Sequence, residues 1–175
     1  MARTPCRPRR ERGLTLIESA VTVGIAAIVL GMAVPGFASL RERERLRAVA
    51  AQFETDVAFA RSLAVTQSDT LRLEFGGARC WVLHDGPPGC SCGDDGALQC
   101  GERRVLRVMA LGAEHPVQLR SNSRALAFDD LRGTVTPTAT VRLSLPDGSQ
   151  LNAVVNLMGR VRWCSPSGLP GYARC

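Results

Sequence analysis

The sequence predicts an α+β protein in which one long N-terminal helix packs on an antiparallel β-sheet head. Apolar residues recur every three or four positions up to about residue 67, which is typical of one helix face. Short alternating segments separated by Gly- and Pro-containing turns follow, and these are typical of antiparallel strands. Because the helical and strand regions are segregated along the chain, the pattern favours α+β over alternating α/β.

The first part of the predicted helix is apolar enough to enter a membrane. Residues 19–40 contain no charged side chain, and these 22 residues suffice to span a bilayer as a helix. Five arginines precede this segment within residues 1–13, so we expect the N-terminus in the cytoplasm and the remainder outside. A cleaved signal peptide is the alternative, but its apolar core is ordinarily only about 7–15 residues long.

The second half of the predicted helix carries an apolar stripe. Its members follow the three-and-four spacing of one helix face: Leu46, Val49, Phe53, Val57, Ala60 and Ala64. The alternating charges of residues 41–45 are expected on a solvated face with local ion pairs. Helical signals end near Ser68, so a single helix is predicted from about Thr15 to Gln67.

Eight short segments after the helix are predicted to be strands. They are residues 70–75, 79–84, 105–110, 116–120, 125–128, 140–145, 150–157 and 160–164. The glycines at 76–77 and the Pro-Asp-Gly at 146–148 are residue types of tight turns between strands. Four aromatic residues are expected to pack in the core or on the sheet: Phe75, Trp81, Phe128 and Trp163.

Cysteines indicate an oxidising compartment. Six of the seven follow the apolar segment and are candidates for disulfides: Cys80, Cys90, Cys92, Cys100, Cys164 and Cys175. Fifteen pairings are open, and closure of the tail by Cys164 and Cys175 is one plausible pair. A zinc site from His84, Cys90, Cys92 and Cys100 is a weaker alternative, because Cys-x-Cys lacks the usual zinc-ligand spacing.

Charge is unevenly distributed along the chain. The net charge is +6, made up of +4 in residues 1–13, −3 in residues 14–99 and +5 in residues 100–175. The basic C-terminal part, rather than the total, therefore indicates where a polyanion would bind. We find no Ser/His/Asp pattern, no phosphate-binding loop and no paired catalytic carboxylates, so we expect a protein that is not an enzyme and needs no cofactor.

Residues 12–18, Arg-Gly-Leu-Thr-Leu-Ile-Glu, resemble the leader junction of type IV pilins and type II secretion pseudopilins. The resemblance implies that a prepilin peptidase cuts after Gly13 and methylates the new N-terminus at Leu14, where most members have Phe. It also implies an assembly role for Glu18, because the family's Glu faces the N-terminal ammonium of a neighbouring subunit in the filament. An ionised carboxylate in an apolar helix is costly unless it is paired, which agrees with this role.

The same resemblance implies the type IV pilin fold and divides the chain into three parts. Residues 1–13 are the cleaved leader, residues 14–40 the transmembrane and assembly half of the helix, and residues 41–175 the periplasmic or extracellular head. We expect a single-pass inner-membrane protein with its head in the periplasm, which later joins the pilus fibre or its tip. The implied partners are other major and minor pilins, the inner membrane before assembly and the prepilin peptidase.

Residues 53–67 and 152–164 are further similar to the GspH/FimT branch of pseudopilins and minor pilins. FimT-type minor pilins of DNA uptake carry a Gly-Arg-x-Arg motif linked to DNA binding, which here is Gly159, Arg160 and Arg162. In a strand, the two arginines would face the same side about 6.8 Å apart. Two guanidinium groups bind phosphates without reading bases, which suits non-specific contact with the DNA backbone.

Two functions follow from this resemblance. The first is a minor pilin of a type IV pilus that binds extracellular DNA non-specifically, through C-terminal arginines, for uptake in natural transformation. The second is a structural minor pilin or a GspH-like type II secretion pseudopilin that primes filament assembly without binding DNA. Neither function requires a cofactor.

Overall fold

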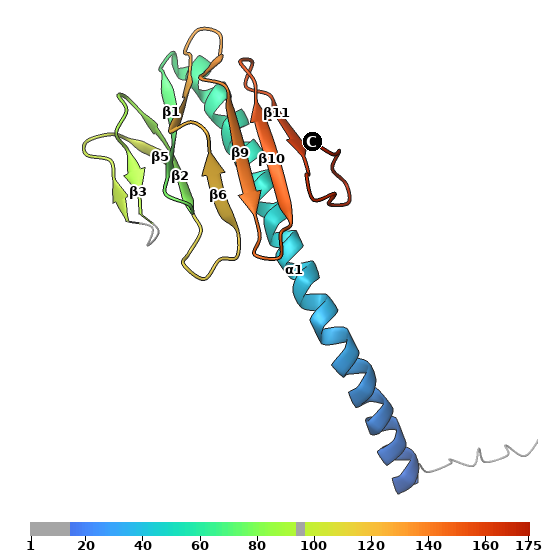
Figure 1. The fold of residues 1–175 in the computed structure, drawn as a ribbon. Helices are drawn as coiled ribbons and strands as arrows, with labels where there is room; N and C mark the ends of the chain where they lie inside the picture. Colours follow the sequence, from blue (N-terminus) through green and yellow to red (C-terminus); the bar gives the residue numbers. More distant parts are fainter. Residues whose placement is uncertain (1–14, 94–96) are drawn as a thin grey trace, which may run out of the picture. The chain divides into compact units, whose positions relative to one another are not determined.

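Helix α1, Leu16–Gln67, is followed by eleven strands in the part of the chain that the structure describes (Figure 1). The structure is a computed structural model that describes residues 15–93 and 97–175, without the side chains of residues 32–36. The predicted leader, with Gly13, and the predicted N-terminus Leu14 lie outside these residues. Residues form two compact units, Met1–Leu40 and Arg41–Cys175. The predicted α+β class is confirmed.

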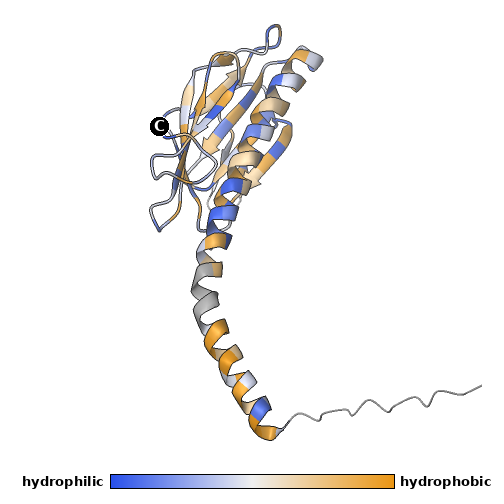
Figure 2. Ribbon diagram, turned by 90° about the vertical axis from the view of Figure 1, so that its right-hand side faces the viewer, coloured by the Kyte–Doolittle hydropathy of each residue, from blue (hydrophilic) through white to orange (hydrophobic). Residues whose placement is uncertain are grey.

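The N-terminal unit contains the first half of α1. Thr15 caps the helix, because the Glu18 N–H donates to Thr15 Oγ1 at 3.4 Å and the Ser19 N–H donates to Thr15 O at 3.1 Å. Apolar side chains from Leu16 to Leu30 are exposed around this segment, and Figure 2 shows that most of its residues are hydrophobic. No helix among the described residues is both long enough and apolar enough to cross a bilayer, so the single-pass span is not confirmed.

Strands of the second unit form two antiparallel sheets and a small ribbon. The five-stranded sheet has the order β5-β2-β1-β7-β8, with β1 Leu71–Gly76, β2 Cys80–Asp85, β5 Val105–Ala110, β7 Ala125–Phe128 and β8 Val135–Thr136. The four-stranded sheet has the order β11-β10-β9-β6, with β6 Gln118–Ser121, β9 Ala139–Ser144, β10 Gln150–Val155 and β11 Val161–Cys164. The ribbon pairs β3 Ser91–Cys92 with β4 Leu98–Gln99.

The core of the second unit lies between α1 and the inner faces of both sheets. All six residues of the predicted helix stripe are buried in one cluster with residues of β1, β2, β7, β9 and β10. Residues of β10 alternate, so that Leu151, Ala153 and Val155 are buried while Val154 is exposed. The four-stranded sheet therefore presents one face to the core and the other to solvent.

Candidate nucleic-acid interface

The predicted DNA-binding residues lie at the hairpin that joins β10 to β11. The Gly159 N–H donates to Asn156 O at 2.9 Å, and the Asn156 N–H donates to Arg160 O at 3.1 Å. The side-chain oxygen Asn156 Oδ1 also accepts from the Arg160 N–H at 2.9 Å. This is a three-residue hairpin loop that places Gly159 in the left-handed position and returns the chain at Arg160. The start of the arginine motif is therefore held by backbone hydrogen bonds.

Gly159 is required by both its backbone conformation and its surroundings. Its φ of 69° lies in the left-handed region, which residues with a Cβ rarely adopt. A Cβ built on Gly159 would stand 3.1 Å from Arg61 Cδ and 3.2 Å from Val135 Cγ2. The absence of a side chain thus lets the stem of Arg61, from α1, lie directly against the hairpin.

Side chains alternate along β11. Arg160 and Arg162 are exposed, whereas Val161 and Trp163 pack against the core cluster. The indole Trp163 Nε1 donates to Glu54 Oε2 on α1 at 3.0 Å. These two partly buried residues fix the strand, so both arginines are directed away from the core as their spacing requires.

A shallow groove beside α1 collects arginines from three segments. It consists of two adjoining hollows that share Ala58 and Gly159: one is lined by Arg61 of α1 and Arg132 of the loop after β7, the other by Arg160 and Arg162 at the β10–β11 hairpin. Within residues 15–93 and 97–175, none of these four guanidinium groups makes an ion pair or donates a hydrogen bond. Nearby acids have other partners: Glu54 accepts from Trp163, and Asp129 Oδ1 accepts from the Leu131 and Arg132 amides. The four guanidinium groups are therefore available to an anion, although the Glu54 carboxylate lines the same hollow as Arg160 and Arg162.

Arg162 also borders a second hollow, beside the C-terminal tail. This hollow is lined by Val154, Arg162, Trp163, Cys164 and the residues 173–175, including Arg174. The tail is held by the Cys164–Cys175 disulfide and by a hydrogen bond of 2.8 Å from the Ser165 N–H to Ala173 O. The disulfide thus keeps Arg174 close to the strand that carries Arg162.

The cysteine-rich loop is fastened as a structural element. The disulfides Cys80–Cys92 and Cys90–Cys100 join it to β2 and to itself. Arg103 donates to the carbonyl oxygens of Pro87, Pro88 and Cys100 at 2.7 to 2.8 Å. The loop cysteines are therefore held in disulfides, and the Arg103 guanidinium is bonded to backbone carbonyl oxygens.

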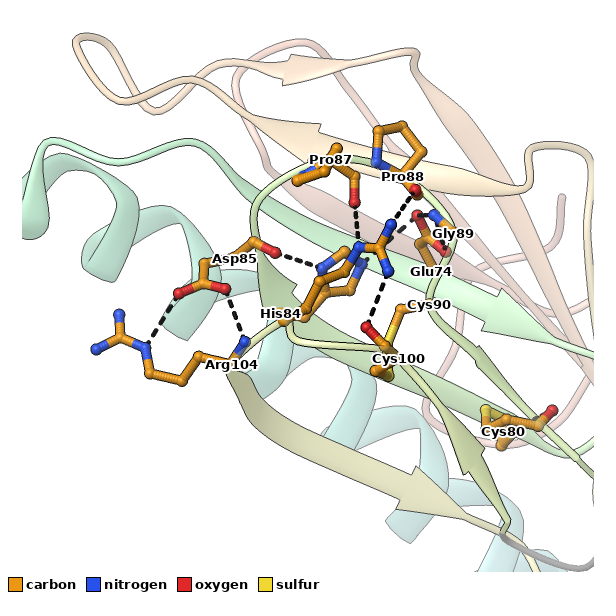
Figure 3. The surroundings of a disulfide bond; sticks show 12 residues. Glu74, Cys80, His84, Asp85, Pro87, Pro88, Gly89, Cys90, Cys100 and Arg104 are labelled. Atoms are coloured by element: carbon orange, nitrogen blue, oxygen red, sulfur yellow. Dashed lines mark hydrogen bonds and ion pairs between the residues drawn. A yellow bond between two sulfur atoms is a disulfide. The ribbon is translucent and has the colours of Figure 1, made fainter.

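His84 lies under this loop rather than at a metal site (Figure 3). The ring is fully buried, and its neighbours are Asp85 O, 2.7 Å from Nδ1, and Glu74 Oε1, 3.5 Å from Nε2. Glu74 in turn accepts a hydrogen bond from the Gly89 N–H at 2.9 Å. Among the described residues, no group of three or more His, Cys, Asp or Glu side chains is placed to hold a metal ion. The alternative zinc site is thus not found there.

A buried carboxylate on α1, Asp56, has a structural role that was not predicted from the sequence. Asp56 is 1% exposed and accepts hydrogen bonds from Trp81 Nε1 at 2.8 Å and from Arg107 Nη1 at 2.9 Å. Gln52 Nε2 donates a third bond at 2.9 Å. These bonds fasten α1 to β2 and β5. The sequence does contain a signal for this contact, because Asp56 is an acidic residue on an otherwise apolar helix face.

His115 lies in the segment leading to β6, and its carbonyl oxygen accepts a hydrogen bond of 3.2 Å from Arg79 Nη1. Its Nδ1 accepts a hydrogen bond of 3.3 Å from the Val117 N–H. Burial, followed by the charges of Arg45 and Arg79, lowers the pKa of His115 from the ordinary value of 6.5. The neutral imidazole is therefore the favoured form in the folded head.

Glu18, the predicted assembly residue, lies in the first turn of α1 and is exposed. A carboxylate at this position interacts favourably with the helix dipole, which provides a structural reason for an acid there. Within the N-terminal unit its backbone N–H is the group that bonds to Thr15. The carboxylate itself faces solvent and is accessible to a partner.

Two family models match different parts of the chain. Residues 49–159 match the family model described as type II transport protein GspH, and residues 8–34 match the prokaryotic N-terminal methylation motif. The family match ends at Gly159, so Arg160 and Arg162 lie just beyond it. No curated protein sequence matches the chain significantly.

Two solved structures share the fold. The type IV minor pilin FimU of Pseudomonas aeruginosa aligns with a TM-score of 0.52 and 17% identity, over 72% of this chain and 96% of FimU. EpsH, a minor pseudopilin of the type 2 secretion system of Vibrio cholerae, aligns with a TM-score of 0.50 and 15% identity, over 70% of this chain and 98% of EpsH. At these identities the likeness concerns the fold alone.

Proposed function

Because the chain belongs to the family of type II transport protein GspH, we propose that it is a minor pilin that binds extracellular DNA through Arg160 and Arg162. The family and the N-terminal methylation motif make the chain a minor pilin or pseudopilin of a type IV pilus or a type II secretion system. DNA binding for uptake in natural transformation is the more specific part of the proposal. After removal of the leader, the apolar helix half of residues 14–40 would anchor it in the inner membrane before it joins other pilins in a filament.

The observation that carries DNA binding is the set of unpaired arginines around the hairpin. Arg160 and Arg162 are exposed, and Arg61 and Arg132 line the adjoining hollow without an ion pair among the described residues. Surface arginines without counter-ions bind phosphate bidentately and remain charged at every physiological pH. Contacts to phosphates alone give binding that is independent of sequence and weakens with salt.

The test is a titration of the full chain, purified in a non-ionic detergent, with a labelled DNA duplex at several salt concentrations. Arg160→Gln/Arg162→Gln should lower the affinity and make the slope of log K against log salt shallower by about 1.8, because two phosphate contacts are lost. Arg41→Gln/Arg43→Gln is the matched control, since both arginines are exposed on α1 and the charge change is equal. Equal binding by both double variants would show that the hairpin is not the site.

A structural role without DNA binding is the second candidate. The match to type II transport protein GspH and the fold of EpsH support a pseudopilin that takes part in filament assembly. This role is favoured if the wild-type chain does not bind duplex DNA even at low salt, while its deletion still abolishes filaments or secretion.

A further inference from the structure

The solvent-facing side of the four-stranded sheet carries arginines and lacks acids. Alternation along the strands assigns one residue in two to this side: Gln118, Arg120, Thr140, Arg142, Ser144, Gln150, Asn152, Val154 and Arg162. None of these residues is acidic, and three are arginines. This face is a different surface from the groove beside α1, and Arg162 on the edge strand β11 borders both.

Arg120 and Arg142 lie directly opposite each other on adjacent strands. They are register partners in the β6–β9 ladder, and both are exposed. Within residues 15–93 and 97–175 neither guanidinium group has an ion pair or a hydrogen bond. Like charges directly opposite on one sheet face destabilise the fold. An anion bound between them would remove that repulsion, so the pair has the chemistry of a phosphate-binding position.

The pair is well separated from Arg162. On β10, Arg162 is paired with Val154 and Arg142 is paired with Asn152, two residues away along the strand. The strands that carry the two arginines, β11 and β9, lie on either side of β10. With about 4.8 Å between strands and about 6.8 Å for two residues, the Cα atoms of Arg162 and Arg142 are about 12 Å apart. This distance is close to the about 12 Å width of the major groove of B-DNA.

The outward positions of these strands also lack aromatic residues. Trp163, the aromatic residue of β11, points to the core and packs edge-on against Phe53 at 6.2 Å. Proteins that bind single-stranded nucleic acid stack the bases on exposed aromatic side chains. A face with arginines and without such side chains contacts phosphates, and a duplex presents two phosphate backbones across a groove.

We propose that Arg120 and Arg142 form a second phosphate-binding position, so that one head holds a DNA duplex at two places, this pair and Arg162. The proposal rests on the proposed function and extends it to a named face of the head and to duplex rather than single-stranded DNA. Arg162 lies at the edge between the groove and the sheet face, so it connects the proposed groove site with the second position.

The experiment compares Arg120→Gln/Arg142→Gln with Arg160→Gln/Arg162→Gln and the control Arg41→Gln/Arg43→Gln, each in the full chain in non-ionic detergent. Binding of a labelled duplex and of an oligothymidine strand is measured at several salt concentrations. The Arg120/Arg142 variant should reduce duplex affinity and make the salt slope shallower by about 0.9, because one phosphate contact is lost. The loss should be smaller for the single strand, and the variant should unfold no earlier than wild type, since a repulsion has been removed.

The outcomes separate the two proposals. In one outcome the wild type and the control bind, the Arg160/Arg162 variant binds weakly, and the Arg120/Arg142 variant keeps the wild-type salt slope. The second position is then wrong, and the proposed function stands. If the Arg120/Arg142 variant unfolds earlier than wild type, the pair has a structural role and the inference is overturned. If the wild type binds neither nucleic acid at low salt, both proposals are wrong.

Discussion

Trp81 Nε1 donates a hydrogen bond to Asp56 Oδ2 at 2.8 Å inside the head, and thereby joins β2 to α1. The indole is fully buried and the carboxylate is 1% exposed. Because Arg107 and Gln52 also donate to Asp56, the acid has partners for both oxygens. The bonded carboxylate determines where the helix contacts the five-stranded sheet.

Replacing Asp56 with Ala should strongly destabilise the head. The change leaves the buried Trp81 Nε1–H without an acceptor and Arg107 without its ion pair, at a cost of about 3 kcal/mol. Glu54→Ala is the matched control, because it removes the exposed bond to Trp163 and should cost only about 1 kcal/mol. Denaturant unfolding measures both free energies, and equal losses would contradict the assignment.

Gly159→Ala should reduce stability more than Gly148→Ala. Both glycines have a positive φ, but a Cβ on Gly148 meets nothing within 4 Å, whereas one on Gly159 meets Arg61 and Val135. The backbone conformation costs about 1–2 kcal/mol in either case, so the difference between the variants reports the contact with α1. Arg61→Ala should restore part of the loss in the Gly159 variant. No restoration would show that Arg61 does not limit the site.

Glu18→Gln should leave processing after Gly13 intact but reduce entry into filaments. The change removes the charge that we expect to pair with a neighbouring N-terminal ammonium, while the size of the side chain is kept. Ser19→Ala, one residue further along α1, is the control. Mass analysis of the purified protein reports the N-terminus, and sheared surface fractions report incorporation. Normal incorporation of the Gln variant would exclude the charge as the assembly determinant.

Acid should destabilise the wild-type head more than a His115→Gln variant. The pKa of His115 is lowered in the folded state, so the unfolded state binds the proton more tightly. The stabilising contribution is therefore complete above the ordinary value of 6.5 and is lost as the pH falls through the lower folded-state value. Unfolding free energies of the two proteins, measured from pH 8 to about pH 4, should differ least at high pH and diverge on acidification. Parallel curves would contradict this.

Periodicity was sufficient to predict the helix and the longer strands. The predicted stripe from Leu46 to Ala64 is buried, and the segments 105–110 and 125–128 coincide with β5 and β7. Such segments are predictable because burial of one face imposes a regular spacing on apolar residues. The short strands β3, β4 and β8 were not predicted, since two residues carry no period and their pairing depends on distant partners.

The site was only partly predictable for the same reason. Alternation along residues 160–163 was enough to expect two arginines on one side, because it is a local property of a strand. The approach of Arg61 to Gly159 and the register of Arg120 with Arg142 depend on contacts between segments far apart in the sequence. The division of the strands into two sheets likewise depends on which strands pair, and not on any one of them.

The C-terminal tail lies along the edge of the four-stranded sheet. β11 is the outermost strand of its sheet, and such an edge exposes unpaired amide and carbonyl groups that recruit strands from other molecules. Ala173 occupies this edge at Cys164 through a parallel bridge, and the disulfide to Cys175 prevents its release. The tail thus covers the C-terminal end of this edge strand, which should hinder edge-to-edge pairing between heads.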